Sequence, residues 1–145
     1  MARVEYHPAF AAQLEELCLN ENALEVAGDV TALLSALEEY GHEIEGEQPE
    51  DASHPVVISR YHMFALRRTP PTLYTPYADA APVIRIPYVW FADTEQQDEL
   101  AVVMLLGDKQ KLGNQWYPKT VVQIEGRMIP DWQRTHPTHK ARRKV

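Results

Sequence analysis

The sequence is poor in the features that mark membrane proteins and disulfide-bonded secreted proteins. Cys18 is the single cysteine of the 145 residues, so no internal disulfide can form, and its apolar neighbours predict that it is buried. No run approaches the roughly 18 apolar residues that a membrane span requires. Residues 1–10 also lack the apolar stretch of a signal peptide. We therefore expect a cytoplasmic protein that contacts no membrane.

Motifs for metal binding and for nucleophilic catalysis are missing as well. The six histidines are scattered, and neither a His-Glu-x-x-His nor a paired-cysteine motif occurs. No serine or cysteine lies in a recognisable nucleophile turn. We expect no metal site and no cofactor.

Basic residues are scarce in the first third of the chain and concentrated at its end. The net charge is −7, and residues 1–50 carry one basic side chain against twelve acidic ones. Residues 101–145 carry nine basic side chains against three acidic ones. This asymmetry indicates an acidic scaffold with a basic working surface, or alternatively a charge dipole without function.

The apolar pattern predicts an α+β domain, and the composition is that of a globular chain. Residues at helical spacing predict a helical hairpin over residues 8–40, and a break near Gly28 is left open. Runs of β-branched and aromatic residues predict the strands 56–59, 61–68, 83–92 and 99–107, of which the last two form a hairpin.

A short helix opened by Pro118 is predicted to follow the last strand and to end or kink at Pro130. This order of elements predicts an antiparallel sheet with helices packed on one face. The other face would then be left for function.

Basic and aromatic side chains gather where the predicted strands meet. Ile84 and Ile86 point to one face of their strand, so Arg85 points to the other. Adjacent strands would bring it near the other cations at strand ends, which are Arg67, Arg68, Lys109 and Lys111. Cations with neighbouring aromatic rings are typical of sites that bind single-stranded RNA. A surface arginine paired with an acid is the alternative for Arg85, and Trp90 is also compatible with the core.

The segments FALRR, VIRIPYVWF, ELAVVMLLGDKQK and WYPKTVVQIEGR resemble, in their order and spacing, the RelE/ParE superfamily of bacterial toxins, particularly its HigB-like branch. The likeness covers about residues 8–128. It implies a RelE-like fold, with an N-terminal helical hairpin packed on a four-stranded antiparallel sheet, a short C-terminal helix and a basic tail. Residues 1–135 would form one toxin domain, and residues 136–145 a disordered basic tail.

The resemblance also implies a function. Such a protein is the toxin of a type II toxin–antitoxin system and acts as a ribosome-dependent, metal-independent mRNA endoribonuclease, or mRNA interferase, that inhibits translation. Its partners would be a cognate antitoxin, the ribosome and mRNA. Attack of a 2′-hydroxyl on the adjacent phosphate needs cations for the developing charge, a base and an acid.

Site residues follow from the resemblance by position. The implied catalytic residues are Arg85, Lys109, Lys111 and Tyr117. The arginine would stabilise the transition state, the lysines would bind RNA or activate the nucleophile, and the tyrosine would transfer a proton or stack on a base. The implied RNA-binding residues are Arg67, Arg68, Trp116, Lys119 and Arg127. A lysine or tyrosine that acts as a base near pH 7 needs a lowered pKa.

Two alternatives stay open. One is a non-catalytic ParE-like toxin or binding module, directed at gyrase or another protein. It is favoured by the acidic N-terminal half and by Leu106, because HigB-like toxins carry a histidine at that position. The other is an unrelated α+β domain whose lysine-rich loop is a solvated turn.

Overall fold

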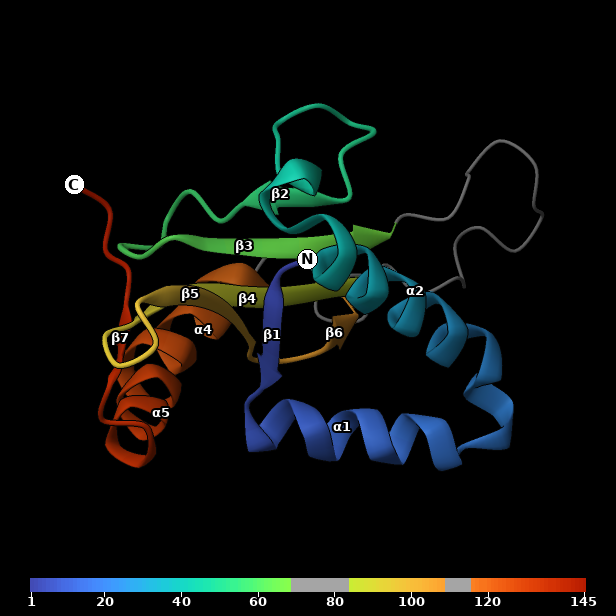
Figure 1. Ribbon diagram of the computed structural model, residues 1–145. Helices are drawn as coiled ribbons and strands as arrows, with labels where there is room; N and C mark the ends of the chain where they lie inside the picture. The colour runs from blue at the N-terminus through green and yellow to red at the C-terminus, as the bar shows by residue number, and fades with distance from the viewer. Residues whose placement is uncertain (69–83, 109–115) are drawn as a thin grey trace.

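The computed structural model describes residues 1–68, 84–108 and 116–145, which form a mixed β-sheet with helices on both faces (Figure 1). The strands are β1 (Arg3–Tyr6), β2 (Ser53–Pro55), β3 (Met63–Arg68), β4 (Ile84–Asp93), β5 (Asp98–Val103), β6 (Gly107–Asp108) and β7 (His139–Ala141). The helices are α1 (Pro8–Leu19), α2 (Leu24–Tyr40), α4 (Trp116–Gln123) and α5 (Ile129–Thr135). The 3₁₀ turns Glu21–Ala23 and Gly41–Ile44 border α2, and the π-helical turn η5 (Ile124–Met128) joins α4 to α5.

The sheet has the order β1-β5-β4-β3-β2, and β6 and β7 also pair with β4. All pairs are antiparallel except that of β1 with β5, which is parallel. The α+β class is therefore confirmed, and the predicted β4–β5 hairpin is present, whereas the predicted four-stranded antiparallel sheet is wrong. The four residues of β1 are too few to show a strand period, so this parallel strand could not be predicted.

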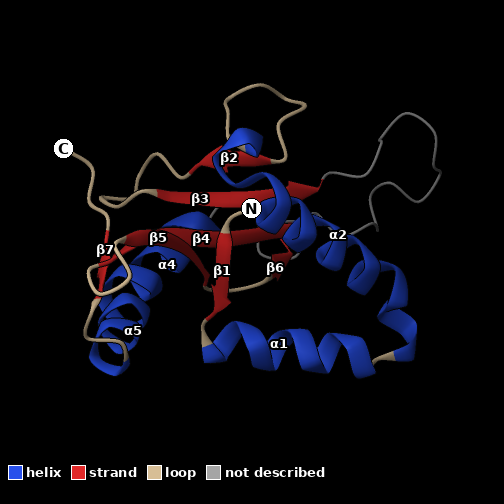
Figure 2. Ribbon diagram, in the orientation of Figure 1, coloured by secondary structure: helices blue, strands red, loops and turns tan. Residues whose placement is uncertain are grey.

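The helical hairpin of α1 and α2 covers one face of the sheet, as predicted (Figure 2). Its buried residues Phe10, Val30, Leu33, Leu34 and Leu37 pack in one cluster with Leu66, Ile84, Ile86, Tyr88, Trp90, Ala101 and Val103 of the sheet. α2 continues unbroken through Gly28, where an added Cβ would meet no atom within 4 Å. Cys18 is exposed on α1 and not buried as predicted. None of the described helices is long and apolar enough to cross a membrane.

The C-terminal helices (α4, η5 and α5) cover the opposite face. Their residues Val121, Ile124, Met128, Ile129 and Trp132 form a second cluster with Met63, Ala65, Val89, Phe91, Leu100 and Val102. The prediction that this face is left uncovered is therefore wrong. Pro130 neither ends the helix nor removes it from the sheet, because the wider turn η5 precedes it and accommodates its ring and missing N–H.

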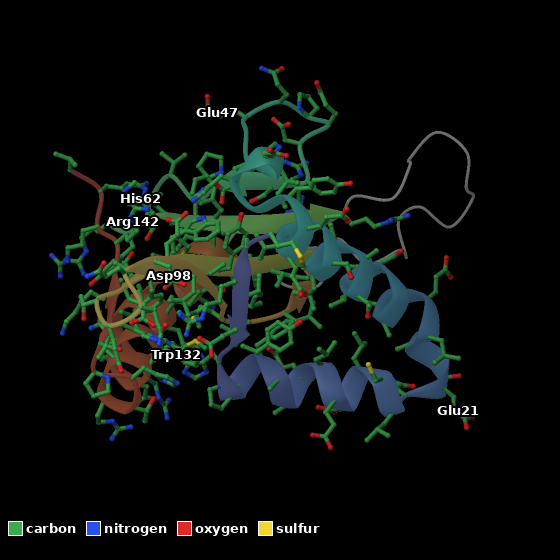
Figure 3. The ribbon with its side chains drawn as sticks, in the orientation of Figure 1. Glu21, Glu47, His62, Asp98, Trp132 and Arg142 are labelled. Atoms are coloured by element: carbon green, nitrogen blue, oxygen red, sulfur yellow. The ribbon has the colours of Figure 1, made fainter. Side chains whose placement is uncertain are left out.

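The segment 136–145, predicted as a disordered tail, instead contributes β7 to the sheet. His139 is held between two partners: Trp132 Nε1 donates to its Nδ1 at 3.0 Å, and its Nε2 lies 3.2 Å from Asp93 Oδ2. Arg3 of β1 donates to the same Asp93 oxygen at 2.9 Å, and this bond holds the pKa of Asp93 well below its usual range. Figure 3 labels Trp132 beside the C-terminal helices, below the strands of the sheet. Both ends of the chain are thus tied to the end of β4.

A second polar network joins the end of α2 to the sheet. Glu45 accepts hydrogen bonds from the Tyr88 hydroxyl at 2.6 Å and from Trp90 Nε1 at 2.7 Å. His42 stacks on Trp90, with 3.9 Å between ring centroids, and its two nitrogens lie 2.7 Å from Glu45 and 2.6 Å from Glu99. Burial alone would lower the pKa of His42, but the two carboxylates outweigh it and raise the pKa. Tyr88 and Trp90 are therefore structural residues.

This network predicts a pH-dependent contribution of His42 to stability. Because the pKa of His42 is raised in the folded chain, its stabilisation is present below the unfolded pKa and is lost as the pH rises through the folded pKa. We expect His42→Gln to lower the free energy of unfolding by about 0.5 kcal/mol at pH 5.5 and by less at pH 8.5. The effect is small because the ring is half-exposed and solvent screens its charge. Urea denaturation at both pH values measures the difference. An equal effect at both pH values would contradict the prediction.

Candidate functional site

Two arginines lie opposite one another at the start of β4. The β3–β4 register pairs Arg67 with Arg85, while Ile84 and Ile86 point into the helical-hairpin cluster. The prediction that Arg85 points away from those isoleucines is therefore confirmed. Its side chain is on the face of the C-terminal helices and is only 6% exposed. Two like charges, one of them buried, lower the stability of the fold, so folding does not explain why this pair is present.

Tyr117, at the start of α4, completes this arrangement. Arg85 Nη1 donates to the carbonyl of Ile84 at 2.8 Å, and the guanidinium also interacts with the Tyr117 side chain through a hydrogen bond. Burial lowers the pKa of Arg85, and the charge of Arg67 adds to this effect, while Tyr117 opposes it. Arginine nevertheless stays charged near neutral pH.

The protonation state of Tyr117 limits what it can do. Burial raises its pKa and outweighs Arg85 and Arg67, which act in the opposite direction. The lowered pKa that a tyrosine base needs is therefore absent. Near pH 7, Tyr117 is a neutral phenol that can donate a proton but cannot accept one at useful rates.

A pocket of about 290 Å³ opens beside these residues. We call it the arginine pocket; it is lined by Arg67, Arg85, Tyr117, His54, Pro55, Val56, Val57 and Ile58. The described carboxylates form no ion pair with Arg67 or Arg85. The lining thus combines two positive charges with aliphatic side chains.

His54 is a pocket residue that sequence reasoning missed. It lies in β2 opposite Ala65, on the same face as Arg67. Its Nε2 is 2.6 Å from the carbonyl oxygen of Gln48, and its Nδ1 is 2.9 Å from Arg67 Nη1. A carbonyl only accepts and a guanidinium only donates, so these partners select a neutral ring protonated at Nε2. The only sequence signal was its place just before an apolar run.

The remaining predicted residues do not join the pocket. Arg68 is exposed on the other face of β3 and lies 3.4 Å from Asp29. Lys119 lines a separate hollow between α1 and α4, and Arg127 is exposed in η5. Lys109 and Lys111 lie outside the described residues.

Trp116 was predicted to bind RNA, but it is a buried packing residue. Its ring covers Gly107, where an added Cβ would lie 2.3 Å from the indole. It also makes an edge contact with Tyr117, with 4.7 Å between ring centroids. Trp116 therefore positions Tyr117 and presents no face for base stacking.

Comparison of the chain with protein-family models, with curated proteins and with solved structures finds no match. The likeness to RelE/ParE toxins stays a prediction from the motifs, and the chemistry of the pocket has to be argued from its own geometry.

The Trp116–Gly107 contact predicts a strong effect of a single methyl group. We expect Gly107→Ala to lower the free energy of unfolding by about 1–3 kcal/mol, because the indole must move to make room. Gly126→Ala is the matched control: it lies in η5 with open space around its Cα, and we expect no loss or a small gain. Thermal denaturation of both variants checks this; equal melting temperatures would contradict it.

The arginine pair predicts that removing the charge of Arg85 makes the fold more stable. We expect Arg85→Met to raise the free energy of unfolding by about 1 kcal/mol, because it removes a buried charge that faces Arg67. Arg68→Met, on the exposed face, should change it by less than about 0.5 kcal/mol. Chemical denaturation gives both values. A destabilised Arg85→Met variant would show that Arg85 is retained for folding.

Proposed function

We propose that the arginine pocket binds the phosphate of single-stranded RNA and that the protein is an endoribonuclease that cleaves by 2′-hydroxyl attack. The observation that carries this proposal is the cross-strand pair Arg67–Arg85, which has no carboxylate partner among the described residues and lies beside a neutral Tyr117. Two adjacent positive charges without a carboxylate partner favour the binding of an anion. Guanidinium groups bind phosphate oxygens through paired hydrogen bonds and are well suited to a phosphorus that gains negative charge.

The acid of this reaction would be Tyr117. As the bond from phosphorus to the 5′ oxygen breaks, the phenol gives its proton to the leaving oxygen. The phenolate that remains is stabilised by Arg85 and Arg67, which both act to lower the pKa of this group. Water then relays to this phenolate the proton that the base has taken from the 2′-hydroxyl.

The base would be His54. Its Nδ1 holds a lone pair that Arg67 occupies at 2.9 Å in the unliganded pocket. A phosphate that draws Arg67 toward itself uncovers this lone pair, which then accepts the proton of the 2′-hydroxyl. The new bond from the 2′ oxygen to phosphorus gives a 2′,3′-cyclic phosphate and a free 5′-hydroxyl, so protons and bonds balance without a further reactant.

The wider role we propose is that of the toxin of a type II toxin–antitoxin system that cuts mRNA on the ribosome and inhibits translation. The motif resemblance supports this role, and the pocket supports the phosphate chemistry. An antitoxin would inhibit the protein by laying acidic side chains over Arg67 and Arg85.

A non-catalytic binding module is the second candidate function. The hydrogen bond between Arg67 and His54 favours it, because it engages the proposed base. In that case the pocket would hold an acidic segment of a protein partner such as gyrase.

Inducible expression in a bacterial host, with mapping of mRNA 5′ ends, tests the proposal. We expect growth arrest and new 5′ ends within translated codons, with cleavage reduced about 10²- to 10³-fold by Arg85→Ala and about 10²-fold by Tyr117→Phe. Arg68→Ala is the matched control, since it lies next to Arg67 but outside the pocket. Cleavage that survives Arg85→Ala would overturn the site. Arrest without cleavage would favour the binding module.

A further inference from the structure

The aliphatic part of the lining of the arginine pocket is not used by the proposed chemistry. It comes from the loop between β2 and β3, where Val57 is 75% exposed and Ile58 is 58% exposed. We call these two residues the apolar lip. Two neighbouring branched side chains thus stay in water next to paired arginines, and a ligand that covered them would gain from burying their apolar surface.

The loop that carries the apolar lip is anchored from two sides. On one side, the Glu125 carboxylate of η5 accepts from Ser59 Oγ at 3.0 Å and from Arg60 Nε at 2.9 Å. On the other side, Lys144 Nζ donates to the carbonyls of Val57 at 3.2 Å and Val56 at 3.4 Å. The backbone of Lys144 also donates to the carbonyl of Arg60 at 2.9 Å. The lip is therefore held in its exposed position and cannot settle into the core.

The ligand must bring both an anion and an apolar surface. The pocket volume of about 290 Å³ lies at the lower end of small-molecule sites, roughly 300–1,000 Å³, and so suits one nucleotide better than a folded partner. A phosphate bound by the arginine pair keeps the attached base in the pocket that Val57 and Ile58 also line. A base offers a flat, largely apolar face, whereas its polar edges can stay in water.

We propose that Val57 and Ile58 form a base subsite that packs on one nucleobase and prefers a purine to a pyrimidine. This inference rests on the proposed RNA function. The carbonyls of Val56 and Val57 already accept hydrogen bonds from Lys144. The apolar lip therefore distinguishes bases by the apolar area that they bury and not by hydrogen bonds to their edges. Lys144 is a positioning residue, since it acts only through the loop.

Binding of 2′-O-methyl trinucleotides, which cannot be cleaved, tests the subsite with the full chain. We expect the wild type to bind an adenine-centred trinucleotide about fivefold more tightly than a cytosine-centred one, as burial of roughly 40 Å² more apolar surface gives. A trinucleotide with an abasic centre should bind most weakly. The Val57→Ser, Ile58→Ser double variant should bind all three with the abasic affinity of the wild type. Methyl NMR of the wild type should show the Val57 and Ile58 signals shifting with the adenine-centred trinucleotide and not with the abasic one.

Val122→Ser is the matched control, because this valine of α4 is 72% exposed and lies outside the pocket. It should keep the fivefold preference. A wild type that binds all three trinucleotides equally would overturn the subsite and leave the phosphate site standing. Failure to bind any of them, including the abasic one, would overturn the proposed RNA function itself. Tight binding of an acidic, leucine-containing peptide that the double variant loses would overturn the nucleobase as occupant.

Discussion

The pairing of β4 on both of its edges is the constraint on which the rest of the structure depends. This strand has ten residues, and its first half pairs with β3 and β6 while its second half pairs with β5 and β7. Both faces are covered by helices, so alternate residues are committed to opposite cores. A slip of one residue would carry Ile84 and Ile86 to the other face and bury Arg85 against α2. The direction of Arg85 is thus fixed by the whole sheet.

The elements that could be predicted are those long enough for their apolar pattern to repeat several times. The hairpin of α1 and α2 and the pair of β4 and β5 follow from apolar spacing, and the direction of Arg85 follows from alternation in β4. β1, β2 and β7 are only three or four residues long, so they become strands through their partners. The tail looked disordered because its composition is basic, yet Asp93 and Trp132 hold His139 in place.

The site shows the same division. The Arg67–Arg85 pairing could be foreseen, because it depends on strand adjacency. His54 could not, because it enters the pocket only through β2. Trp116 was misread because an aromatic ring among cations carries no sign of its burial, which here comes from the close approach to Gly107. The raised pKa of Tyr117 likewise depends on burial, which the sequence does not state.

The acidic composition is compatible with a phosphate-binding pocket because the sheet separates the charges. The exposed acids of the first forty residues lie on α1, on α2 and in the turn between them, and these helices pack on one face of the sheet, whereas Arg67, Arg85 and Tyr117 lie on the other. The Debye length at physiological ionic strength is about 8–10 Å. Exposed acids beyond that distance are largely screened, while the guanidinium groups inside the pocket are screened much less. Among the described residues, the lining of the arginine pocket itself carries two arginines and no carboxylate, so its fixed charge is positive although the chain as a whole is negative.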